Sequence, residues 1–374
     1  MDEDGSSDAD HATRCGGLPM RLATHAQRLE RWLGRDQLDH LHLAMRNWYG
    51  PPIPVGHVPG NVMVTAGGDF YGPIRGGSFT SLSDLIAEAS AGKRRDFTFS
   101  KVATAGVVGV TSSLWGVGNF PPAGANASAA PTGNAPTDAT TGAFAFVNPT
   151  SPDTQHFVSA TVLASVTGNT LLLYDRLFHV NKTMNSTATE AVTGVPTRYQ
   201  STTPGAMDSA EGNFLFVEVG GTARAATAHN WTVCTYTDND GNASTLPSLT
   251  GNASALARRL DHPVQQWFAP LESGDRGIRT LTQMQCSSAV ATGVINFVIG
   301  HPLVWLPIPL LNTACVLDGI NSAFNLARIF DDAALADVEV DLFHPRHGSC
   351  VLRLVVGLVL VRVGWNGLDA KADA

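Results

Sequence analysis

The feature that most constrains the fold of this chain is a succession of short apolar runs whose side chains alternate between two faces. In GNFLFVEVGG, residues 212–221, Phe214, Phe216 and Glu218 alternate with three aliphatic residues. From residue 143 to 364 such runs are separated by turn-forming residues about every 8–12 positions, which is typical of all-β domains. This pattern predicts a β-sandwich or barrel of antiparallel strands rather than βαβ units.

Two of these runs predict β-hairpins. HFVSATVLASVTGNTLLLYDRLF, residues 156–178, reads as two strands with Thr167, Gly168 and Asn169 at the tip. HNWTVCTYTDNDGNAS, residues 229–244, predicts a strand from Trp231 to Thr237 followed by a tight turn at 238–241. Asn, Asp and Gly tolerate positive φ, so a turn accounts for this acidic stretch better than a calcium loop does.

The remainder of the chain has a less uniform pattern. Leucines spaced three and four residues apart predict a helical hairpin near the start. A short helix is expected over Ser81–Gly92, with Ser83 as its cap. The predicted segments are a disordered acidic tail (1–19), the N-terminal helical hairpin (20–50), a mixed segment with a short helix and strands (51–117), a low-complexity loop or linker (118–142), the β-rich domain (143–364) and a tail (365–374).

Charged residues are scarce, at 15% of the chain against roughly 25% in typical globular proteins. The net charge is −8, and Asp and Glu residues within the first ten positions supply five of those negative charges. No basic stripe is present, which argues against dedicated nucleic-acid binding. A surface with few charges and many Gly, Ala, Ser, Thr and Asn residues favours contacts with other proteins.

Cysteine usage and hydropathy indicate the compartment. Five scattered cysteines, an odd number, argue against a disulfide framework and favour assembly in a reducing environment. No secretory signal is evident. The apolar run Cys350–Gly364 is short and contains Arg353 and Arg362, so it predicts a strand rather than a membrane span.

A group of charged residues, Asp175, Arg176, His179 and Lys182, raises the question of an acid–base site. On a regular strand Asp175 and Arg176 point to opposite faces, while Asp175 and His179 share one. A local ion pair and a buried histidine are therefore favoured. The tract that follows has few large apolar side chains, so it is expected to be ordered by lying against another surface. The Gly/Ala/Ser/Thr-rich arms at 118–142 and 181–210 are expected to reach neighbouring subunits.

Motifs of catalysis and metal binding are missing from the sequence. It contains no nucleophile elbow, P-loop, dinucleotide fingerprint or paired zinc motif. His344, His347 and Cys350 are spaced like zinc ligands, but no second cluster accompanies them. His40 and His42 point to different faces of a helix. The sequence therefore predicts no catalytic, cofactor-binding or metal residues and no enzymatic activity.

Aromatic residues leave a second class open, a carbohydrate-binding β-sandwich module exposed on a particle or cell surface. Trp231, Tyr236, Trp267 and Trp305 would be its sugar platforms, although large aromatics in strands are more often core residues. Six N-x-S/T triplets add a weak indication of surface glycan. Coplanar, exposed rings would favour this class, and buried rings would exclude it.

Several segments resemble uncharacterised virion structural proteins (capsid or head-associated) of tailed bacteriophages. The resemblance covers about residues 45–340 and is carried by LLLYDRLFHVNKTMNSTATEAVTGVPTRYQ, ATAHNWTVCTYTDNDGN, RRLDHPVQQWFAPLESGDRGI, VINFVIGHPLVWLP and DGINSAFNLARIFDDAALADVEV. It does not extend to the acidic start or to the end of the chain.

This resemblance implies a multi-copy subunit of the virion, assembled in the host cytoplasm, whose partners are copies of itself and other virion proteins. The family offers no catalytic residues to carry over, and the sequence itself predicts no cofactor and no membrane association. A head-decoration protein and the shell-forming major capsid protein both remain open. The sequence shows no long helix after residue 50 of the kind that the tailed-phage shell fold uses as its spine, which favours decoration.

Overall fold

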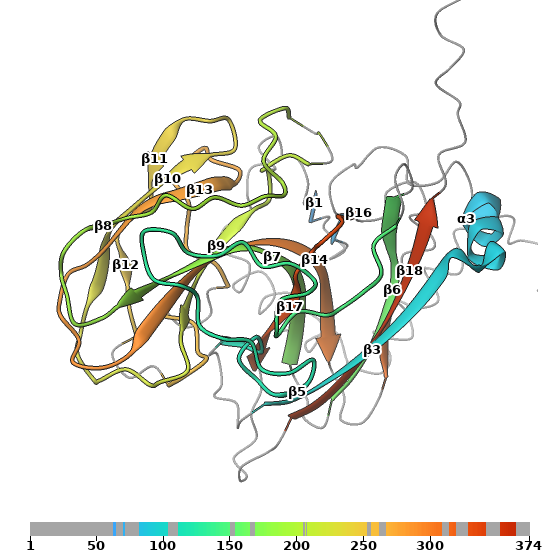
Figure 1. Cartoon of the computed structure of the whole chain (residues 1–374), viewed down its shortest axis with the longest axis horizontal. Helices are drawn as coiled ribbons and strands as arrows, with labels where there is room; N and C mark the ends of the chain where they lie inside the picture. Colours follow the sequence, from blue (N-terminus) through green and yellow to red (C-terminus); the bar gives the residue numbers. More distant parts are fainter. Residues whose placement is uncertain are drawn as a thin grey trace, which may run out of the picture. The chain divides into compact units, whose positions relative to one another are not determined.

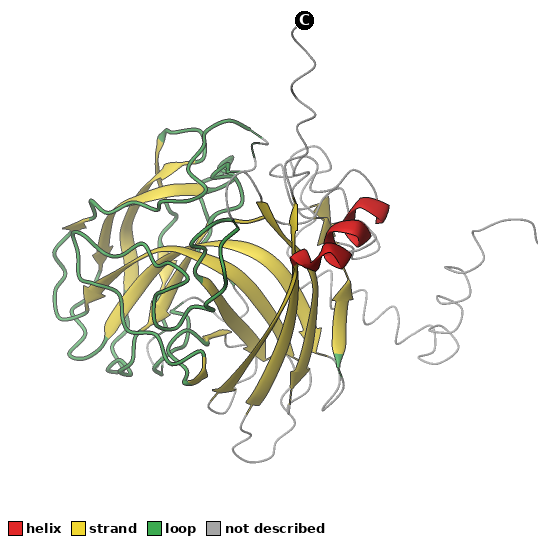
Figure 2. Ribbon diagram, turned by 45° about the vertical axis from the view of Figure 1, so that its right-hand side comes forward, coloured by secondary structure: helices red, strands yellow, loops and turns green. Residues whose placement is uncertain are grey.

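The computed structural model of the protein describes residues 63–64, 70–71, 82–103, 111–149, 154–164, 169–204, 206, 208–252, 256–261, 267–308, 314–318, 328–341 and 352–363. All of them belong to one compact unit, Val58–Ala374. They are mainly β-strands (Figures 1 and 2), which confirms the predicted mainly β class. The helical hairpin predicted at 20–50 and the zinc-like residues His344, His347 and Cys350 lie outside the described residues.

A six-stranded antiparallel sheet has the order β15–β6–β18–β3–β5, and β16 pairs with β6 as well. Its middle strand, β18, pairs with β6 on one edge and β3 on the other (Figure 1). The strand bounds are β3 Arg94–Ala103, β5 Asn119–Phe120, β6 Thr154–Ala164, β15 Cys315–Asp318, β16 Arg328–Ile329 and β18 Leu352–Val363.

The central sheet has five strands in the order β4–β17–β7–β14–β9, and all its neighbours are antiparallel. β7 and β14 are its long pair, with fifteen residues each. The strand bounds are β4 Thr111–Ser113, β7 Asn169–Thr183, β9 Phe214–Val219, β14 Val294–Ile308 and β17 Leu335–Asp341.

The end sheet is formed around β10 and β13, in the order β11–β10–β13–β8, with β12 also pairing with β10. A separate two-stranded sheet joins β1 and β2. The strand bounds are β8 Glu190–Ala191, β10 Asn230–Asp238, β11 Ala243–Thr245, β12 Leu249–Thr250, β13 Ile278–Cys286, β1 Met63–Val64 and β2 Phe70–Tyr71.

The described helical segment is short. The α-helix α3 spans Leu82–Glu88 and continues as a π-helical segment, Ala89–Lys93. A helix was expected here, but it begins at Leu82, so Ser83 lies inside its first turn and does not cap it. Leu85 is buried and Ile86 is 56% exposed, as expected for a helix that lies on a surface.

Two of the three hydrophobic clusters lie on one face of the central sheet. Leu171 and Leu173 of β7 pack in a cluster with side chains of the six-stranded sheet, such as Phe157. Farther along β7, Val180 packs in a cluster with side chains of the end sheet, such as Leu281. In both halves the alternate side chains of the central sheet contribute to the third cluster, for example Leu172, Tyr174, Phe216 and Val298. The central sheet is therefore shared by two sandwiches.

The predicted hairpin over residues 156–178 is wrong. β6 and β7 are both strands, but β6 pairs with β18 in the six-stranded sheet and β7 pairs with β14 in the central sheet. The connection at 165–168 therefore crosses between sheets, because β6 is paired along its length with β18 and β7 along its length with β14. The other predicted hairpin is confirmed, since β10 pairs with β11 through the turn that begins at Asp238.

The segments expected to act as arms pack against their own chain. The backbone of Asn134 exchanges two hydrogen bonds of 2.8 Å with that of His179, and Ala130 N donates to Asn181 O at 3.1 Å. Past Lys182, Val192 N donates to Thr282 O at 2.8 Å. The hydrogen bonds of Ala130 and Asn134 extend the pairing of β7 beyond Asp175, which lies opposite Leu335, the first residue of β17. The lack of large apolar residues is compensated by backbone hydrogen bonds to neighbouring strands.

Candidate functional site

The charged residues of β7 belong to separate ion pairs rather than to one acid–base site. Asp175 accepts two hydrogen bonds from Arg198, at 2.9 and 2.8 Å, and one from Ala334 N at 2.9 Å. Lys182, which is fully buried, forms an ion pair with Glu190 of β8. Asp175, Arg176 and Lys182 therefore face three different partners, and the preference for ion pairs over an acid–base set is consistent with the geometry.

One detail of the strand geometry differs from the regular alternation assumed above. Ile299 pairs with Phe178 and Gly300 pairs with Arg176, so Leu177 is an extra residue on β7. Such a β-bulge shifts the alternation of side chains by one position. His179 consequently lies beside Arg176 rather than Asp175, and its Nδ1 accepts a hydrogen bond of 3.0 Å from Arg176 Nε.

Arg176 is the centre of a buried network on the loop-covered face of the central sheet. Its Nη1 donates to Glu218 at 2.9 Å and to the Tyr174 hydroxyl at 3.1 Å, and its guanidinium lies 4.6 Å from the centre of the Trp115 ring. Burial lowers the pKa of Arg176, but the opposing effects of Glu218 and Tyr174 are stronger, so the pKa is raised overall. Arg176 therefore stays positively charged and stays paired with Glu218.

His179 is neutral in this setting. Burial, and then the positive charge of Arg176, hold its pKa well below the usual value. A neutral ring with its lone pair on Nδ1 is the form that accepts the hydrogen bond from Arg176. The remaining oxygen of Glu218 accepts a 3.0 Å hydrogen bond from the Asn296 amide, which completes the network.

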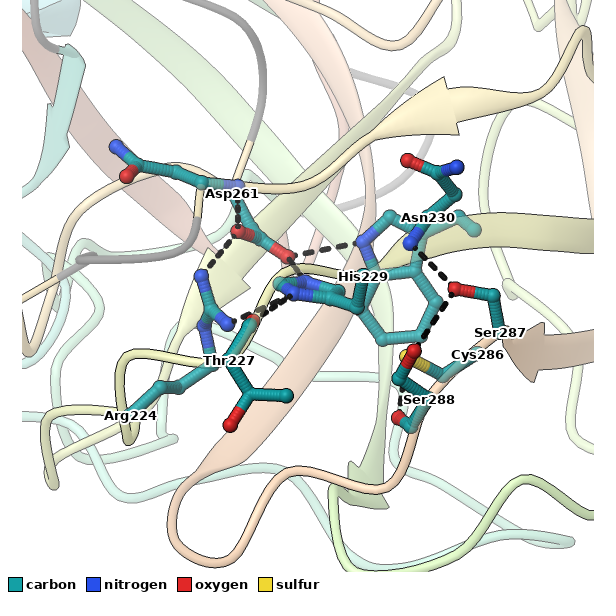
Figure 3. A network of polar contacts seen from close by, with 10 residues as sticks. Arg224, Thr227, His229, Asn230, Asp261, Cys286, Ser287 and Ser288 are labelled. Carbon is teal, nitrogen blue, oxygen red and sulfur yellow. Dashed lines mark hydrogen bonds and ion pairs between the residues drawn. The ribbon is translucent and has the colours of Figure 1, made fainter.

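A second network surrounds the buried carboxylate of Asp261, and it most closely resembles a catalytic constellation (Figure 3). Four donors reach this carboxylate: Arg224 Nη2 at 2.6 Å, Asn252 N at 2.7 Å, and both His229 Nε2 and Trp231 Nε1 at 2.9 Å. Burial raises the pKa of Asp261, but the His229 hydrogen bond and the Arg224 charge outweigh it and lower the pKa overall.

Asp261 and His229 resemble the acid and base of a hydrolase, and Cys286, Ser287 and Ser288 lie nearby in Figure 3. In a triad, however, the histidine nitrogen that does not face the acid must reach the nucleophile. Here His229 Nδ1 lies 3.0 Å from Thr227 O and 3.2 Å from Arg224 Nη1. Both ring nitrogens are thus engaged, and neither has a Ser or Cys partner among the residues that the structure describes.

The nearby hydroxyl and thiol groups are engaged elsewhere. Ser287 Oγ accepts a 2.8 Å hydrogen bond from Asn230 N, and Cys286 Sγ lies 3.2 Å from Ser288 O (Figure 3). Burial raises the pKa of the Cys286 thiol, which keeps it protonated and unreactive. The Asp261 network therefore joins the loop before β10 and the loop after β12 to Trp231 of β10.

The acidic turn Asp238–Asn242 is a hairpin turn. Asp238 Oδ1 accepts hydrogen bonds from Asp240 N at 2.9 Å and Asn242 N at 2.7 Å, and Gly241 has a positive φ of 94°. Asp238 Oδ2 accepts a 3.2 Å hydrogen bond from the Asn242 side-chain amide, so both oxygens face donors within the turn. Among the residues that the structure describes, no group of three or more His, Cys, Asp and Glu is arranged to hold a metal ion.

The aromatic residues considered as sugar platforms do not form a flat surface. Trp231 and Tyr236 are buried, at 2% and 1% exposure. Trp267 and Trp305 are partly exposed, but their rings meet edge to face at 85°. A sugar ring stacks on an open aromatic face, and these four rings do not share one.

Sequence reasoning missed most residues of these networks, including Arg198, Glu218, Arg224, His229 and Asp261. One signal was present for Glu218, which is a charged residue inside the apolar run FLFVEV of a chain with few charges. None of the described helices is long and apolar enough to span a membrane.

Comparison with known proteins gives little further guidance. No family model matches the chain, and no curated protein matches it. A structure of the infectious bursal disease virus Gt strain matches at 10% identity, covering 72% of this chain and 81% of that chain, with a TM-score of 0.15. The VP2 subviral particle of the same virus matches at 11% identity, over 72% and 80% of the two chains, also with a TM-score of 0.15. These TM-scores are too low to establish a shared fold.

Proposed function

We propose that this protein is a structural subunit of a virus particle, present in many copies and acting through contacts with copies of itself and with other particle proteins. The proposal rests on the location of the charged residues in the folded chain. Eleven Asp, Glu, Lys and Arg residues of the described chain are buried, although such residues are rarely buried unless paired. In a chain with only 15% charged residues, this leaves the described part of the surface with few charges.

Such a surface suits extended protein contacts. Charged residues are depleted at the centres of protein interfaces, because each buried charge must lose its water. Large apolar side chains are also exposed on six separate segments, for example Phe120 at 63% and Val147 at 64%. Their wide distribution favours several modest contacts with different neighbours over one deep binding groove.

Within this proposal we favour a tailed-bacteriophage particle and a head-decoration position, with location in the virion. The phage context is supported by the sequence resemblance. The decoration position is supported by helix length, because the α-helix in the described residues, α3, has seven residues and is too short to be a shell spine. A major capsid protein that forms the shell itself is the alternative.

Electron microscopy and mass photometry of the purified protein test the proposal. A structural subunit is expected to form rings, trimers or closed shells as its concentration rises, and closed shells formed by this chain alone would identify the major capsid protein. A uniform monomer at every concentration, and after mixing with purified phage heads, would contradict the proposal.

Matched variants connect assembly to the surface. Phe120→Lys and Val147→Lys place a charge on exposed apolar positions and are expected to reduce assembly. Gln283→Lys, at an exposed polar position of β13, is the control and should assemble normally. All three variants should keep the thermal stability of the unaltered chain, because each position is open to solvent.

A further inference from the structure

The middle strand of the six-stranded sheet, β18, joins the two sides of the sheet. β18 pairs with β3 from Leu352 to Val361 and with β6 from Leu354 to Val363. In the described sheet β3 and β6 do not pair with each other. β3 and β6 flank a gap one strand wide, which we call the slot. β18 occupies the slot and is paired along nearly its whole length. Without β18, two long strand edges would expose unpaired backbone groups.

The chain that leads into β18 is longer than the distance that it has to cross. Asp341, at the end of β17, pairs with Asn169, and Leu354 of β18 pairs with Ala164. The connection 165–168 crosses from β6 to β7 with four residues, whereas ten residues, 342–351, connect β17 to β18. Extended chains of these lengths reach about 13 and about 33 Å. The longer connection therefore has a reserve of six residues, about 20 Å of extended chain, over the shorter one.

This reserve is long enough to reach a neighbouring molecule. We propose that the slot between β3 and β6 accepts β18 from a second copy of the chain, so that β18 links subunits by strand exchange. This inference rests on the proposed function, because exchange requires many copies packed close together. An exchanged strand makes the same hydrogen bonds and side-chain contacts as the chain's own strand, so the two states differ mainly in the course of the connection.

The protein concentration determines whether β18 stays in its own chain or is exchanged with a second copy. A strand tethered to its own chain has an effective concentration of the order of millimolar, so a dilute protein fills its own slot. In an assembling particle the neighbours' strands reach comparable local concentrations, and exchange becomes competitive. On this proposal β18 is a link between subunits that forms during assembly.

Disulfide trapping tests the exchange directly. Gly357 of β18 lies opposite Thr98 of β3. Directly opposed residues of antiparallel strands have Cα atoms about 4.5–5.5 Å apart, which suits a disulfide. One chain carries Thr98→Cys and an N-terminal mass tag, and the other carries Gly357→Cys. Both are made in the same cells, in a background with Cys15→Ser, Cys315→Ser and Cys350→Ser; Cys234 and Cys286 are buried and stay.

Strand exchange predicts a disulfide-linked dimer of the two different chains on a non-reducing gel. Its yield should be about tenfold higher in concentrated or assembled samples than in dilute ones. Val359→Cys replaces Gly357→Cys in the matched control. Val359 lies opposite Asp96, two residues out of register with Thr98, so this combination should give little dimer.

A single chain with both Thr98→Cys and Gly357→Cys reports whether the slot exists. If this chain closes its internal disulfide while the two single variants never form the mixed dimer, exchange is excluded. If the double variant forms no disulfide at all, the register is wrong and the inference fails as well. Particles that assemble without the mixed dimer would overturn the inference alone, whereas a protein that never assembles would overturn the proposed function.

Discussion

The two halves of β7 lie in different surroundings, although the strand is continuous. In its first half, Leu171 and Leu173 face the six-stranded sheet in a cluster of aliphatic and aromatic side chains. In its second half, Phe178 and Val180 also face a hydrophobic cluster, but Arg176 and Lys182 are fully buried there as well, and both are ion-paired. The first half is flanked by strands on both edges, whereas the second half has loop 128–134 at one edge in place of β17.

The difference shows what buried charges do in this protein. Each ionic network also holds the backbone of a loop: Asp175 binds Ala334 N, Asp261 binds Asn252 N, and Lys182 Nζ binds Ala188 O at 3.2 Å. Buried backbone groups need partners, and an irregular loop cannot obtain all of them from a strand ladder. Where strands close the core, apolar packing is sufficient. Where loops close it, charged side chains supply the missing hydrogen bonds.

The largest expected effect is at the centre of the Asp261 network. Asp261→Asn removes the negative charge that four donors share and leaves Arg224 buried without a counter-charge. We expect a loss of about 4 kcal/mol in the free energy of unfolding, measured by urea denaturation. Asp240→Asn, at a position 49% exposed and paired with Arg276, is the control and should cost less than about 1 kcal/mol.

A truncation in the apolar half provides the comparison. Leu171→Ala removes a fully buried side chain from the cluster between the two sheets. The lost contacts and the cavity are expected to cost about 3 kcal/mol in the same urea assay. If this cost clearly exceeded that of Asp261→Asn, the ionic networks would be less important for stability than the apolar core, and the comparison above would be wrong.

Low pH should destabilise the folded protein through His179, which lies in the second half of β7. Its pKa is lowered in the folded protein, so the unfolded chain binds a proton that the folded chain refuses. Stability from this source is complete above the unfolded pKa of about 6.5 and falls by up to about 1.4 kcal/mol per pH unit below it. His179→Gln keeps a hydrogen-bond acceptor for Arg176. Unfolding measured at pH 7.5 and 5.5 should therefore show a smaller acid loss in this variant.

The smallest expected effect is at an exposed ion pair. Arg94 and Asp96 of β3 lie 2.9 Å apart, with side chains 55% and 60% exposed. Solvent screens such a pair, so Arg94→Ala should change the unfolding free energy by less than about 0.5 kcal/mol. A large loss in thermal denaturation would show that an ion pair stabilises this fold whether or not it holds a loop.

The sequence predicted strands better than it predicted their partners. Alternation in FLFVEV places Leu215, Val217 and Val219 in the core beside the end sheet and Phe216 on the opposite face, as observed. Alternation depends on neighbouring residues, so it can be read locally. Pairing depends on the whole chain, and for this reason β6 and β7 were predicted as a hairpin although they belong to different sheets.

The candidate site was less predictable for the same reason. Arg224 and Asp261 are 37 residues apart and meet only in the folded chain. The bulge at Leu177 also has no clear signal in the sequence, yet it determines that His179 lies beside Arg176. The number of charged residues in a chain does not indicate which of them are buried or which ones pair.

The position of β18 also determines the order in which the protein can fold during translation. The ribosome completes β3 and β6 long before it synthesises residues 352–363, which must lie between them. The end sheet and most of the central sheet can therefore form while the six-stranded sheet is still incomplete. Until β18 emerges, both walls of its slot are open edges of the kind that promote aggregation. A nascent chain of this protein would therefore depend on chaperones until β18 completes the six-stranded sheet.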